Sequence, residues 1–388
     1  MSRTNNLIWR RALLALLFAL LTALLVRTYI GGVFRVESTS MEPTLHASPE
    51  RVFVRYSRGF VPGRFELVVF TPSAESAAVV KRVAGLPGES ILISGGDLLI
   101  EGRRLGAEVP RPEPIPIFDS KFEPIDQAFS VLSVPWNHSA DAWRLDARGR
   151  REDLRYTRSA TDDHLDATGR RIEGVREVND LRLEGRFVFA NTGELTLHVT
   201  EEGDTFEFEI EIVAGAPSML RLLRRSSDGT ASVLSERSAS ATPGQACAVS
   251  LENVDNHLVG MLGSLVLCAD YEANSPLVGV PDETYRHLKP RAGLAVSGLE
   301  LDVQWLCLSR DVFYTPAGQL GSGSPVALGP DELFLLGDNS SDSRDSRMFG
   351  AVRLTELTGH PNLVVWPPTA MRRLGRLRCL PRAQAAGQ

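Results

Sequence analysis

The sequence predicts a mainly β protein with one N-terminal transmembrane helix and a large inserted antiparallel β-sandwich-like module. Three observations lead to this fold class. A single apolar run, residues 12–34, is long enough to cross a bilayer. Short apolar bursts separated by Gly and Pro fill most of the remaining chain, which is typical of strands. Residues 195–200 and 206–212 alternate between apolar and polar side chains, as half-buried strands do.

Length and composition allow two or three folding units and exclude some functions. The 388 residues are 43% hydrophobic and 23% charged, as in ordinary globular proteins. A net charge of -6 gives no chain-wide basic surface, so we expect no nucleic-acid partner. The cysteines are too few for a disulfide scaffold and form no C-x-x-C pair, although one bridge among the first three stays open. They are Cys247, Cys268, Cys307 and Cys379.

The N-terminal segment is expected to be a single uncleaved membrane anchor. Residues 1–11 are polar and end in Arg10 and Arg11, and residues 12–34 supply the span. The positive-inside rule then places residues 1–11 in the cytoplasm and the rest on the outer side of the bilayer. A cleaved secretory peptide is the alternative, but Arg27 and its neighbours stand where an A-x-A cleavage site would be.

Residues 35–108 are expected to form the first part of a β domain. Apolar bursts at 52–54, 67–70 and 77–84 predict three strands, and residues 91–100 predict a hairpin with a glycine turn. The third burst contains Lys81, a charged residue inside an apolar strand.

A Pro-rich connector at residues 109–118 predicts a domain junction. The inserted part, 119–325, begins with a polar tract that ends near residue 180 and continues as the sandwich, for which a lectin-like form is one option. In the tract, His164 lies near Asp162, Asp163 and Asp166, but we expect a solvated loop there rather than a metal site. Carbohydrate binding, contact with a partner and simple spacing all remain open as roles of the insert.

Residues 326–368 are expected to complete the domain that residues 35–108 begin. The apolar strand Leu333–Leu336 runs directly into a polar turn, Gly337–Gly350, and residues 363–366 predict a last short strand. The basic tail, 369–388, is expected to be mobile or to lie near anionic lipid headgroups.

Chemistry is suggested by a serine just beyond the anchor and a lysine in an apolar strand. Taken alone, Ser40 is best interpreted as part of a polar turn before Pro43. A serine hydroxyl attacks a carbonyl only when a nearby base takes its proton, so a nucleophile requires a base from elsewhere in the chain. A lysine in water, with a pKa near 10.4, is a poor base, but burial can lower the pKa by several units. None of the seven histidines lies where a Ser-His-Asp arrangement would need it.

Three motifs then coincide, and the chain resembles bacterial type I signal peptidases, the membrane-anchored Ser-Lys endopeptidases of the peptidase S26 type. Ser40–Leu45 (S-M-E-P-T-L) matches the nucleophile motif, Val79–Glu89 (V-V-K-R-V-A-G-L-P-G-E) the lysine motif, and Gly337–Gly350 the G-D-N…S-x-D-S-R…G turn. Phe65–Phe70 is similar to the strand before the lysine. The motifs appear in the expected order, and the insert lies outside them.

The resemblance implies roles for individual residues. Ser40 corresponds to the nucleophile, Lys81 to the general base, and Ser343 to the hydroxyl that orients the lysine. Ser38 corresponds to a hydroxyl that joins the Ser40 N–H in the oxyanion hole. Five further residues are expected to support the site structurally: Arg82, Asp338, Asn339, Asp345 and Arg347. No metal or organic cofactor is implied.

Three departures from the family pattern stand out. Thr39 occupies a position where a small residue is common, Phe349 replaces a more usual Trp or Tyr, and the interval from Lys81 to Gly337 is unusually long. None removes a reacting group, and the long interval implies an insertion between two parts of one site.

The implied function is signal peptidase I: cleavage of signal peptides from exported preproteins at the outer face of the cytoplasmic membrane, through an acyl-enzyme. The expected partners are preproteins and the lipid bilayer, with the secretion translocon as a further candidate. The alternative is a catalytically silent, membrane-tethered β-sandwich that binds an envelope glycan or a secretion partner. A self-cleaving repressor-type Ser-Lys protease is disfavoured, because an apolar anchor stands where a DNA-binding helix pair would be needed.

Overall fold

The computed structural model describes residues 3–57, 59–72, 77–131, 137–139, 142–201, 203–213, 217–226, 228–239, 243–272 and 292–382. The chain forms two compact units. The first unit comprises residues 1–90 and 327–376, and the second unit comprises residues 91–326 and 377–388. Residues 91–100, which the sequence grouped with the first part of the β domain, thus belong to the second unit.

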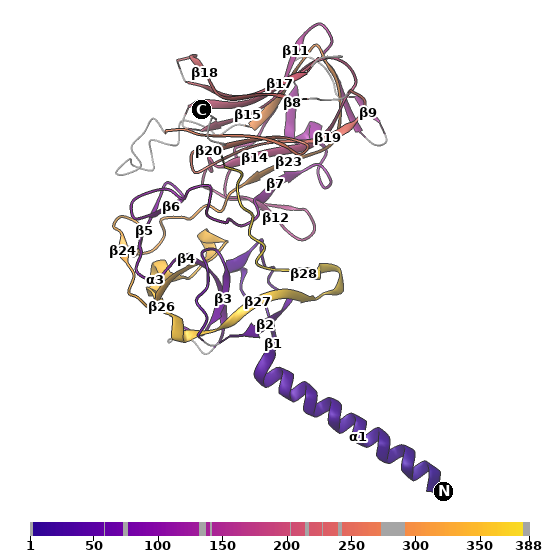
Figure 1. The fold of residues 1–388 in the computed structure, drawn as a ribbon, viewed down its shortest axis with the longest axis vertical. Helices are drawn as coiled ribbons and strands as arrows, with labels where there is room; N and C mark the ends of the chain where they lie inside the picture. The colour runs from indigo at the N-terminus through magenta and orange to yellow at the C-terminus, as the bar shows by residue number, and fades with distance from the viewer. Residues whose placement is uncertain are drawn as a thin grey trace. The chain divides into compact units, whose positions relative to one another are not determined.

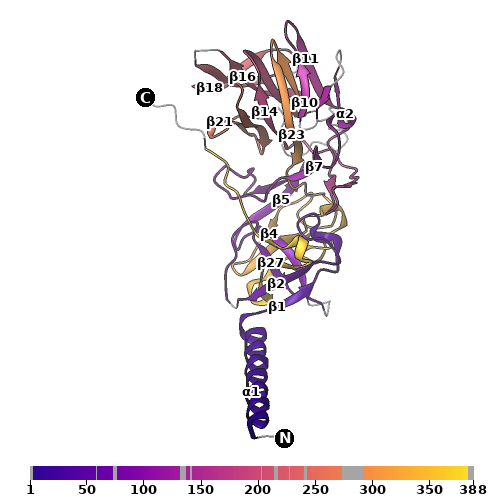
Figure 2. The same ribbon diagram turned by 90° about the vertical axis from the view of Figure 1, so that its right-hand side faces the viewer.

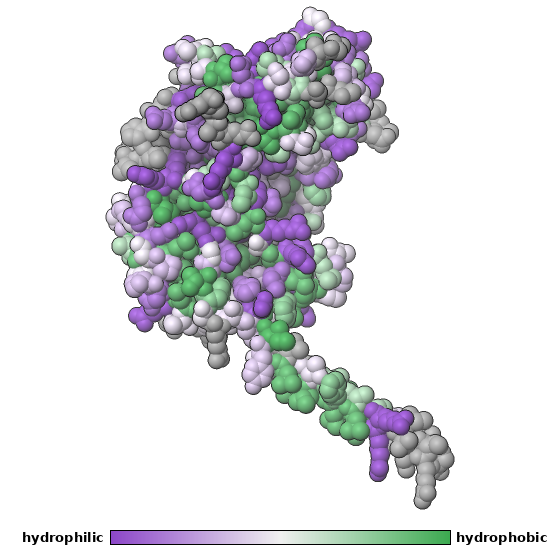
Figure 3. Space-filling view, in the orientation of Figure 1, coloured by the Kyte–Doolittle hydropathy of each residue, from purple (hydrophilic) through white to green (hydrophobic). Residues whose placement is uncertain are grey.

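The N-terminal helix α1 (Arg3–Leu25) continues into a π-helical turn at Val26–Ile30. Within the described residues it is the one helix that is long and apolar enough to cross a membrane, with a mean hydropathy of 2.2 in the window Trp9–Ile30. Apolar side chains cover its surface (Figure 3). The Thr22 hydroxyl donates to the Phe18 carbonyl at 2.8 Å, which satisfies a polar group within the apolar helix. The mainly β fold with one N-terminal apolar helix is therefore confirmed.

The main sheet of the first unit is antiparallel, with the strand order β1-β2-β27-β3-β4-β25-β26 and β28 beside β27 (Figure 1). A short helix, α3 (Ser346–Phe349), follows β25. The strands are β1 (Gly31–Arg35), β2 (Arg51–Tyr56), β3 (Leu67–Phe70), β4 (Val79–Gly85), β25 (Glu332–Leu336), β26 (Val352–Arg353), β27 (Leu357–Trp366) and β28 (Arg372–Arg373). A separate three-stranded sheet, whose β5–β6 hairpin belongs to the second unit, consists of β24 (Val326–Ala327), β5 (Ser90–Ser94) and β6 (Asp97–Ile100).

Apolar cores on both faces of this sheet explain why its central strands read as continuous apolar runs. Leu67 and Val69 of β3 belong to one core, whereas Val68 and Phe70 belong to the other. Because successive side chains of a strand point to opposite faces, a strand covered on both faces needs apolar residues at every position. Strand β4 pairs with β3, so Lys81 stands opposite Val68 in the interior of the unit.

Two large antiparallel sheets form the second unit (Figure 2), which confirms the predicted inserted β-sandwich. One has the order β21-β20-β19-β14-β23-β10-β9, with β7 beside β23, and the other has the order β18-β17-β16-β15-β22-β11-β8. The elements are β7 (Ile115–Asp119), α2 (Ile125–Ala128), β8 (Phe129–Val131), β9 (Asn137–Ser139), β10 (Ala142–Asp146), β11 (Arg151–Tyr156), β12 (His164–Leu165), β13 (Arg171–Ile172), β14 (Leu181–Phe189), β15 (Gly193–Glu201), β16 (Asp204–Ile212), β17 (Ser218–Arg225), β18 (Ala231–Ala239), β19 (Ala246–Val254), β20 (His257–Leu262), β21 (Leu265–Asp270), β22 (Ala292–Ser297) and β23 (Glu300–Arg310).

The alternating pattern of the sandwich strands places one set of side chains in a single core. Leu195, Leu197 and Val199 of β15 are fully buried there, and β16 contributes its own apolar face. The apolar run at residues 258–267 is divided between two strands, because the chain turns at Gly263 between β20 and β21. Gly263 has φ 58°, a conformation that favours glycine.

The cysteines are all free, so the bridge that the sequence left open is not formed. Burial raises the pKa of the Cys247 thiol to about 11 and that of the Cys307 thiol to about 12. Both thiols are therefore protonated and unreactive at neutral pH.

The expectation of a solvated loop around His164 was wrong. The side chains of Asp163 and His164 are buried, and Asp163 is fully used as an acceptor. It receives hydrogen bonds from the Arg171 Nε at 2.7 Å and the Gly174 N–H at 2.5 Å, while the Arg310 Nε donates to its carbonyl at 2.8 Å. One arginine of the same tract, Arg171, and one distant arginine, Arg310, thus hold this charged tract in ordered structure.

The expectation of a mobile basic tail was also wrong for residues 369–382. In the first unit, Arg372 lies in β28 and pairs with Glu50, whose side chain is buried, at 2.6 Å. In the second unit, Arg378 pairs with the buried Glu252 and bonds through its backbone to Arg111 at 2.8 Å in both directions. Each of these arginines compensates a buried carboxylate, and for this reason the segment is held in place.

Replacement of Asp163 by alanine is expected to destabilise the second unit by roughly 2–4 kcal/mol, because it leaves the Arg171 guanidinium and the Gly174 N–H without their acceptor. Denaturant unfolding monitored by fluorescence measures this change. The control is Asp302→Ala, which removes the partner of the exposed Arg144 and should cost much less. Equal costs for the two variants would contradict the interpretation.

Candidate active site

Ser40 lies in a 3-10 turn, Thr39–Met41, directly after the first strand region of the first unit. Its side chain is 7% exposed, and the buried Met41 and Leu45 anchor the turn in the core. The Ser38 Oγ caps the turn by accepting the Ser40 N–H at 3.1 Å. On the other side, the Ser40 carbonyl accepts the Asn339 N–H at 3.1 Å. The serine is therefore held by backbone contacts on both sides.

Lys81 reaches this serine from the middle of β4. Its Nζ lies 2.6 Å from the Ser40 Oγ and 3.1 Å from the Ser343 Oγ. The Lys81 side chain is 3% exposed, so these contacts are shielded from water. An amine in contact with a serine hydroxyl inside a protein can exchange a proton with it, which is the chemistry of an activated nucleophile.

Arg82, the next residue of β4, points to the opposite face and forms a buried ion pair. Its Nε and Nη2 contact the two carboxylate oxygens of Asp338 at 2.6 and 2.5 Å, and its Nη1 donates to the Phe65 carbonyl at 2.7 Å. The Thr44 hydroxyl also donates to Asp338, at 2.5 Å. This bidentate pair ties β4 to the segment after β25 and to the segment after Ser40.

A second buried ion pair organises the turn Gly337–Gly350. Asp345 and Arg347 are both 0% exposed, and their side chains approach to 2.7 Å. One Asp345 oxygen accepts the Ser343 hydroxyl at 2.7 Å and the Gly337 N–H at 3.0 Å. Arg347 also donates to the Ser340 carbonyl at 2.8 Å. Asp345 thus fixes the hydroxyl that contacts Lys81.

Gly337 is required by the close packing of these parts. A Cβ at this position would lie 2.2 Å from the Ser343 Oγ and 2.5 Å from the Ser40 carbonyl oxygen. No side chain fits at those distances, so the backbone of the turn approaches Ser40 only because residue 337 is glycine.

A cleft of about 580 Å³ leads to the Ser40 hydroxyl. One wall is the chain from Phe34 to Met41, and another runs from Ala77 to Lys81. Its lining also includes residues 341–344, Met348 and the core residues Leu45, Val52, Val54 and Val69, so apolar side chains alternate with polar and charged ones. An extended segment of a ligand can lie along such a cleft.

The nine residues singled out from the sequence lie together in the first unit. Ser40, Lys81 and Ser343 are in direct contact, and Ser38 lies beside the Ser40 N–H but accepts from it. The other five form the supporting contacts: Arg82, Asp338, Asn339, Asp345 and Arg347. The sequence did not single out Thr44 or Ser340. Thr44 binds Asp338, which is 294 positions away. The Ser340 hydroxyl accepts from Arg347, and only its position within the Gly337–Gly350 turn could have indicated this.

The solved structures that resemble the chain match the sandwich region only loosely. A carbohydrate-binding module, CBM66 from Bacillus subtilis, superposes with a TM-score of 0.33 and 10% identity, and covers 47% of this chain and 95% of that one. At this level of similarity, the likeness gives no information about a ligand.

Sequence relatives match the parts of the chain that carry the site. The family described as "Signal peptidase, peptidase S26" matches residues 9–131 and 312–366. "Signal peptidase I P" of Bacillus subtilis subsp. natto is 31% identical over 34% of this chain and 70% of the relative. "Signal peptidase I" of Bacillus licheniformis is 36% identical over 24% of this chain and 50% of the relative, about half its length. On this similarity, the chain belongs to the signal peptidase family, peptidase S26.

Proposed function

We propose that the first unit is a serine endopeptidase of the signal peptidase I type, with Ser40 as nucleophile and Lys81 as general base. The observation that carries the proposal is the buried contact of 2.6 Å between the Lys81 Nζ and the Ser40 Oγ. Burial favours the neutral form of an amine, and in that form the Ser40 O–H donates to the Nζ lone pair.

In the proposed reaction, the Ser40 Oγ attacks the scissile carbonyl carbon while its proton passes to the Lys81 Nζ. The tetrahedral intermediate collapses, Lys81 returns the proton to the leaving amine, and an ester between Ser40 and the signal peptide forms. Water activated by the same amine then hydrolyses this acyl-enzyme. The Ser343 Oγ accepts from Nζ and donates to Asp345, so it orients the amine toward Ser40.

The oxyanion is proposed to bind at the Ser40 N–H and the Ser38 hydroxyl. In the free protein, these two groups bond to each other at 3.1 Å, with Ser38 as the acceptor. Rotation of the Ser38 hydroxyl on substrate binding releases the N–H and turns O–H toward the same oxygen. Such a pair of donors stabilises the charge that develops in the transition state.

The substrate is proposed to be an exported preprotein, bound in extended form in the cleft with small residues before the cut, the A-x-A pattern. The apolar helix would hold the site at the bilayer, with residues 1–11 in the cytoplasm and the part of the first unit that follows the helix at the outer face. The secretion translocon is a candidate partner. The alternative function is that of a catalytically silent, membrane-tethered sandwich. It does not account for the burial of Lys81 beside Ser40, because burying an amine costs free energy of folding.

Ser40→Ala and Lys81→Ala are each expected to lower the cleavage rate of a preprotein by about 10⁴-fold or more, since either change removes a reacting group. The measurement uses the detergent-solubilised full chain and a purified preprotein with an A-x-A site. Ser232→Ala and Lys121→Ala, at exposed positions of the second unit, serve as matched controls and should keep the wild-type rate. If both site variants also cleave at that rate, the dyad assignment is wrong.

Ser38→Ala is expected to lower kcat by roughly 10²- to 10³-fold with little change in KM, because the lost hydroxyl acts on the transition state rather than on the bound substrate. Steady-state kinetics on a peptide substrate measure both constants. Ser38→Thr keeps the hydroxyl and should retain most of the activity. A rise in KM with unchanged kcat would assign Ser38 to substrate binding instead.

Gly337→Ala is expected to reduce kcat by roughly 100-fold, because the added methyl group displaces Ser343 and the Ser40 backbone by about 1 Å. The matched control is Gly63→Ala, whose Cβ would meet its nearest neighbour at an ordinary 3.7 Å. The same assay measures both variants, and equal rates would show that the turn has room at residue 337.

A further inference from the structure

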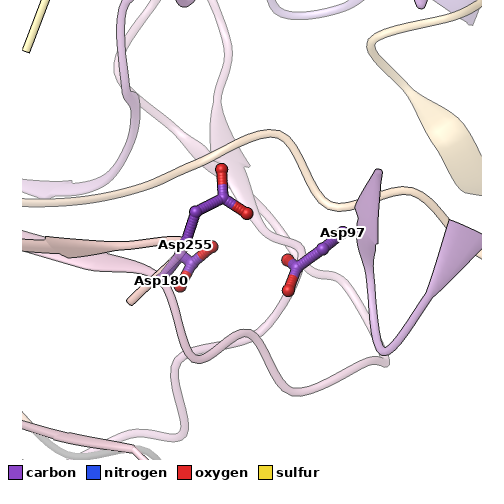
Figure 4. A group of neighbouring side chains, drawn as sticks. All are labelled: Asp97, Asp180 and Asp255. Carbon is purple, nitrogen blue, oxygen red and sulfur yellow. The ribbon is translucent and has the colours of Figure 1, made fainter. Parts of the chain in front are cut away.

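Three aspartates from separate loops of the second unit converge on one point. Asp97 begins β6, Asp180 directly precedes β14, and Asp255 lies in the turn between β19 and β20. One carboxylate oxygen of each lies within 4.8 Å of the others, in the described part of the chain. Figure 4 shows the three carboxylates facing one another.

Asp180 is the member that protein contacts do not explain. Its side chain is 8% exposed, and among the described residues the influences on its carboxylate are burial and the charges of neighbouring acids and Arg104, with no hydrogen bond. Asp180 lines a small, partly open space of about 30 Å³ together with Asp97, and the Oδ1 of Asp311, which lines the same space, is buried without a partner. A buried carboxylate without a donor is strongly unfavourable, so its surroundings point to a positively charged ligand.

The charges around this space do not balance. Glu201 and Asp311 bring the number of neighbouring carboxylates to five. Two arginines oppose them: Arg104, which contacts Asp97 at 3.2 Å and Glu201 at 3.8 Å, and Arg111, which pairs with Asp255. With every group ionised, three negative charges remain in excess inside the protein, and either protons or a cation must offset them.

We propose that Asp97, Asp180 and Asp255 bind one calcium ion in the second unit. A set of oxygen ligands suits a hard cation, and oxygens bound to Ca²⁺ at 2.3–2.6 Å lie at most about 5 Å apart, which agrees with the limit of 4.8 Å. The space of about 30 Å³ is about the size of one ion. Mg²⁺, which usually keeps several waters, is less suited to it.

The two arginines position the ligands rather than replace the ion. Arg111 holds one oxygen of Asp255, and Arg104 holds one oxygen of Asp97, so each carboxylate keeps its second oxygen for the cation. Asp255 and Asn256 have φ 48° and 63°, as the two central residues of a tight β-hairpin turn commonly do, and this turn presents the Asp255 carboxylate. The ion would join the β5–β6 hairpin, the start of β14 and the β19–β20 turn, three segments far apart in the sequence.

The alternative to a calcium ion is that protons neutralise the three aspartates. The pH dependence of stability distinguishes these two possibilities. Burial, partly opposed by Arg104, raises the pKa of Asp97 to about 8, and burial also raises the pKa of Asp180. Because the folded Asp97 binds a proton that the unfolded chain has lost, the stability of the metal-free protein falls as pH rises from about 4 to about 8. Calcium needs the ionised carboxylates, so its effect grows over the same range.

The test measures thermal unfolding of the detergent-solubilised full chain at pH 6 and pH 9, with EGTA or with CaCl₂. At pH 9, free Ca²⁺ at about 100 times Kd is expected to raise Tm by about 5 to 10 °C, and at pH 6 by much less. Asp180→Asn should abolish the response and raise the Tm of the metal-free protein, because it removes the unpartnered charge. Asp146→Asn, at an exposed acid paired with Arg148 outside the cluster, should leave the response intact.

Isothermal titration calorimetry of the wild-type chain gives an independent readout, which does not depend on how well a variant folds. One Ca²⁺ per chain is expected at pH 7, with proton release that varies with the ionisation enthalpy of the buffer. Absence of Ca²⁺ binding, a response to Mg²⁺ alone, or a full response in Asp180→Asn would overturn the proposal. Both readouts are independent of peptidase activity.

Discussion

The contact between a buried amine and a serine hydroxyl is the interaction on which the first unit depends. Lys81 can lie in the interior only because β4 is packed between two cores and because Ser40 and Ser343 meet its Nζ. An amine buried without such partners would be strongly unfavourable. The positions of the turn at Ser40 and of the turn after β25 are therefore both set by the requirements of one lysine.

Two buried ion pairs flank this contact and differ in what they fix. The Arg82–Asp338 pair joins strand β4 to the return of the chain, while the Asp345–Arg347 pair shapes a single turn from within. In both pairs, further hydrogen bonds use the remaining oxygens and nitrogens, which is the condition under which a buried pair is tolerated. The acids around Asp180 in the second unit do not have such a full set of hydrogen-bond and ion-pair partners. The two ion pairs of the first unit show what a fully compensated buried carboxylate looks like in this chain.

Much of the first unit could be predicted because its signals are local. An apolar burst containing Lys81 predicts a buried strand, and Gly337 at the end of another strand predicts a tight turn. Contacts between distant segments could not be predicted in this way. The tract around Asp163 looked solvated because Arg310, which binds the Asp163 carbonyl, is far along the chain, and Arg372 looked mobile because nothing near it indicates the buried Glu50.

The second unit shows the same limit. Alternation of apolar and polar residues predicted its strands, since the period of two is visible within nine residues of β15. The meeting of Asp97, Asp180 and Asp255 is not visible in the sequence, because each acid lies in a polar loop or turn where acids are common. Only the order in which the strands pair brings the three loops together.

The pairing of β4 with β25 has a consequence for how the chain folds. Gly85 stands opposite Phe334, and the segments beyond them are joined by hydrogen bonds from Gly88 to Gly329 and from Leu328 to Glu89. About 240 residues lie between these bonds, and closing a disordered loop of that length costs about 2.5 kcal/mol more than closing one of 15 residues. An insert that folds first, with its ends paired as β5 and β24, removes most of this entropic cost. Formation of the Ser40, Lys81 and Ser343 contacts is then limited by the folding rate of a module that contributes none of their atoms.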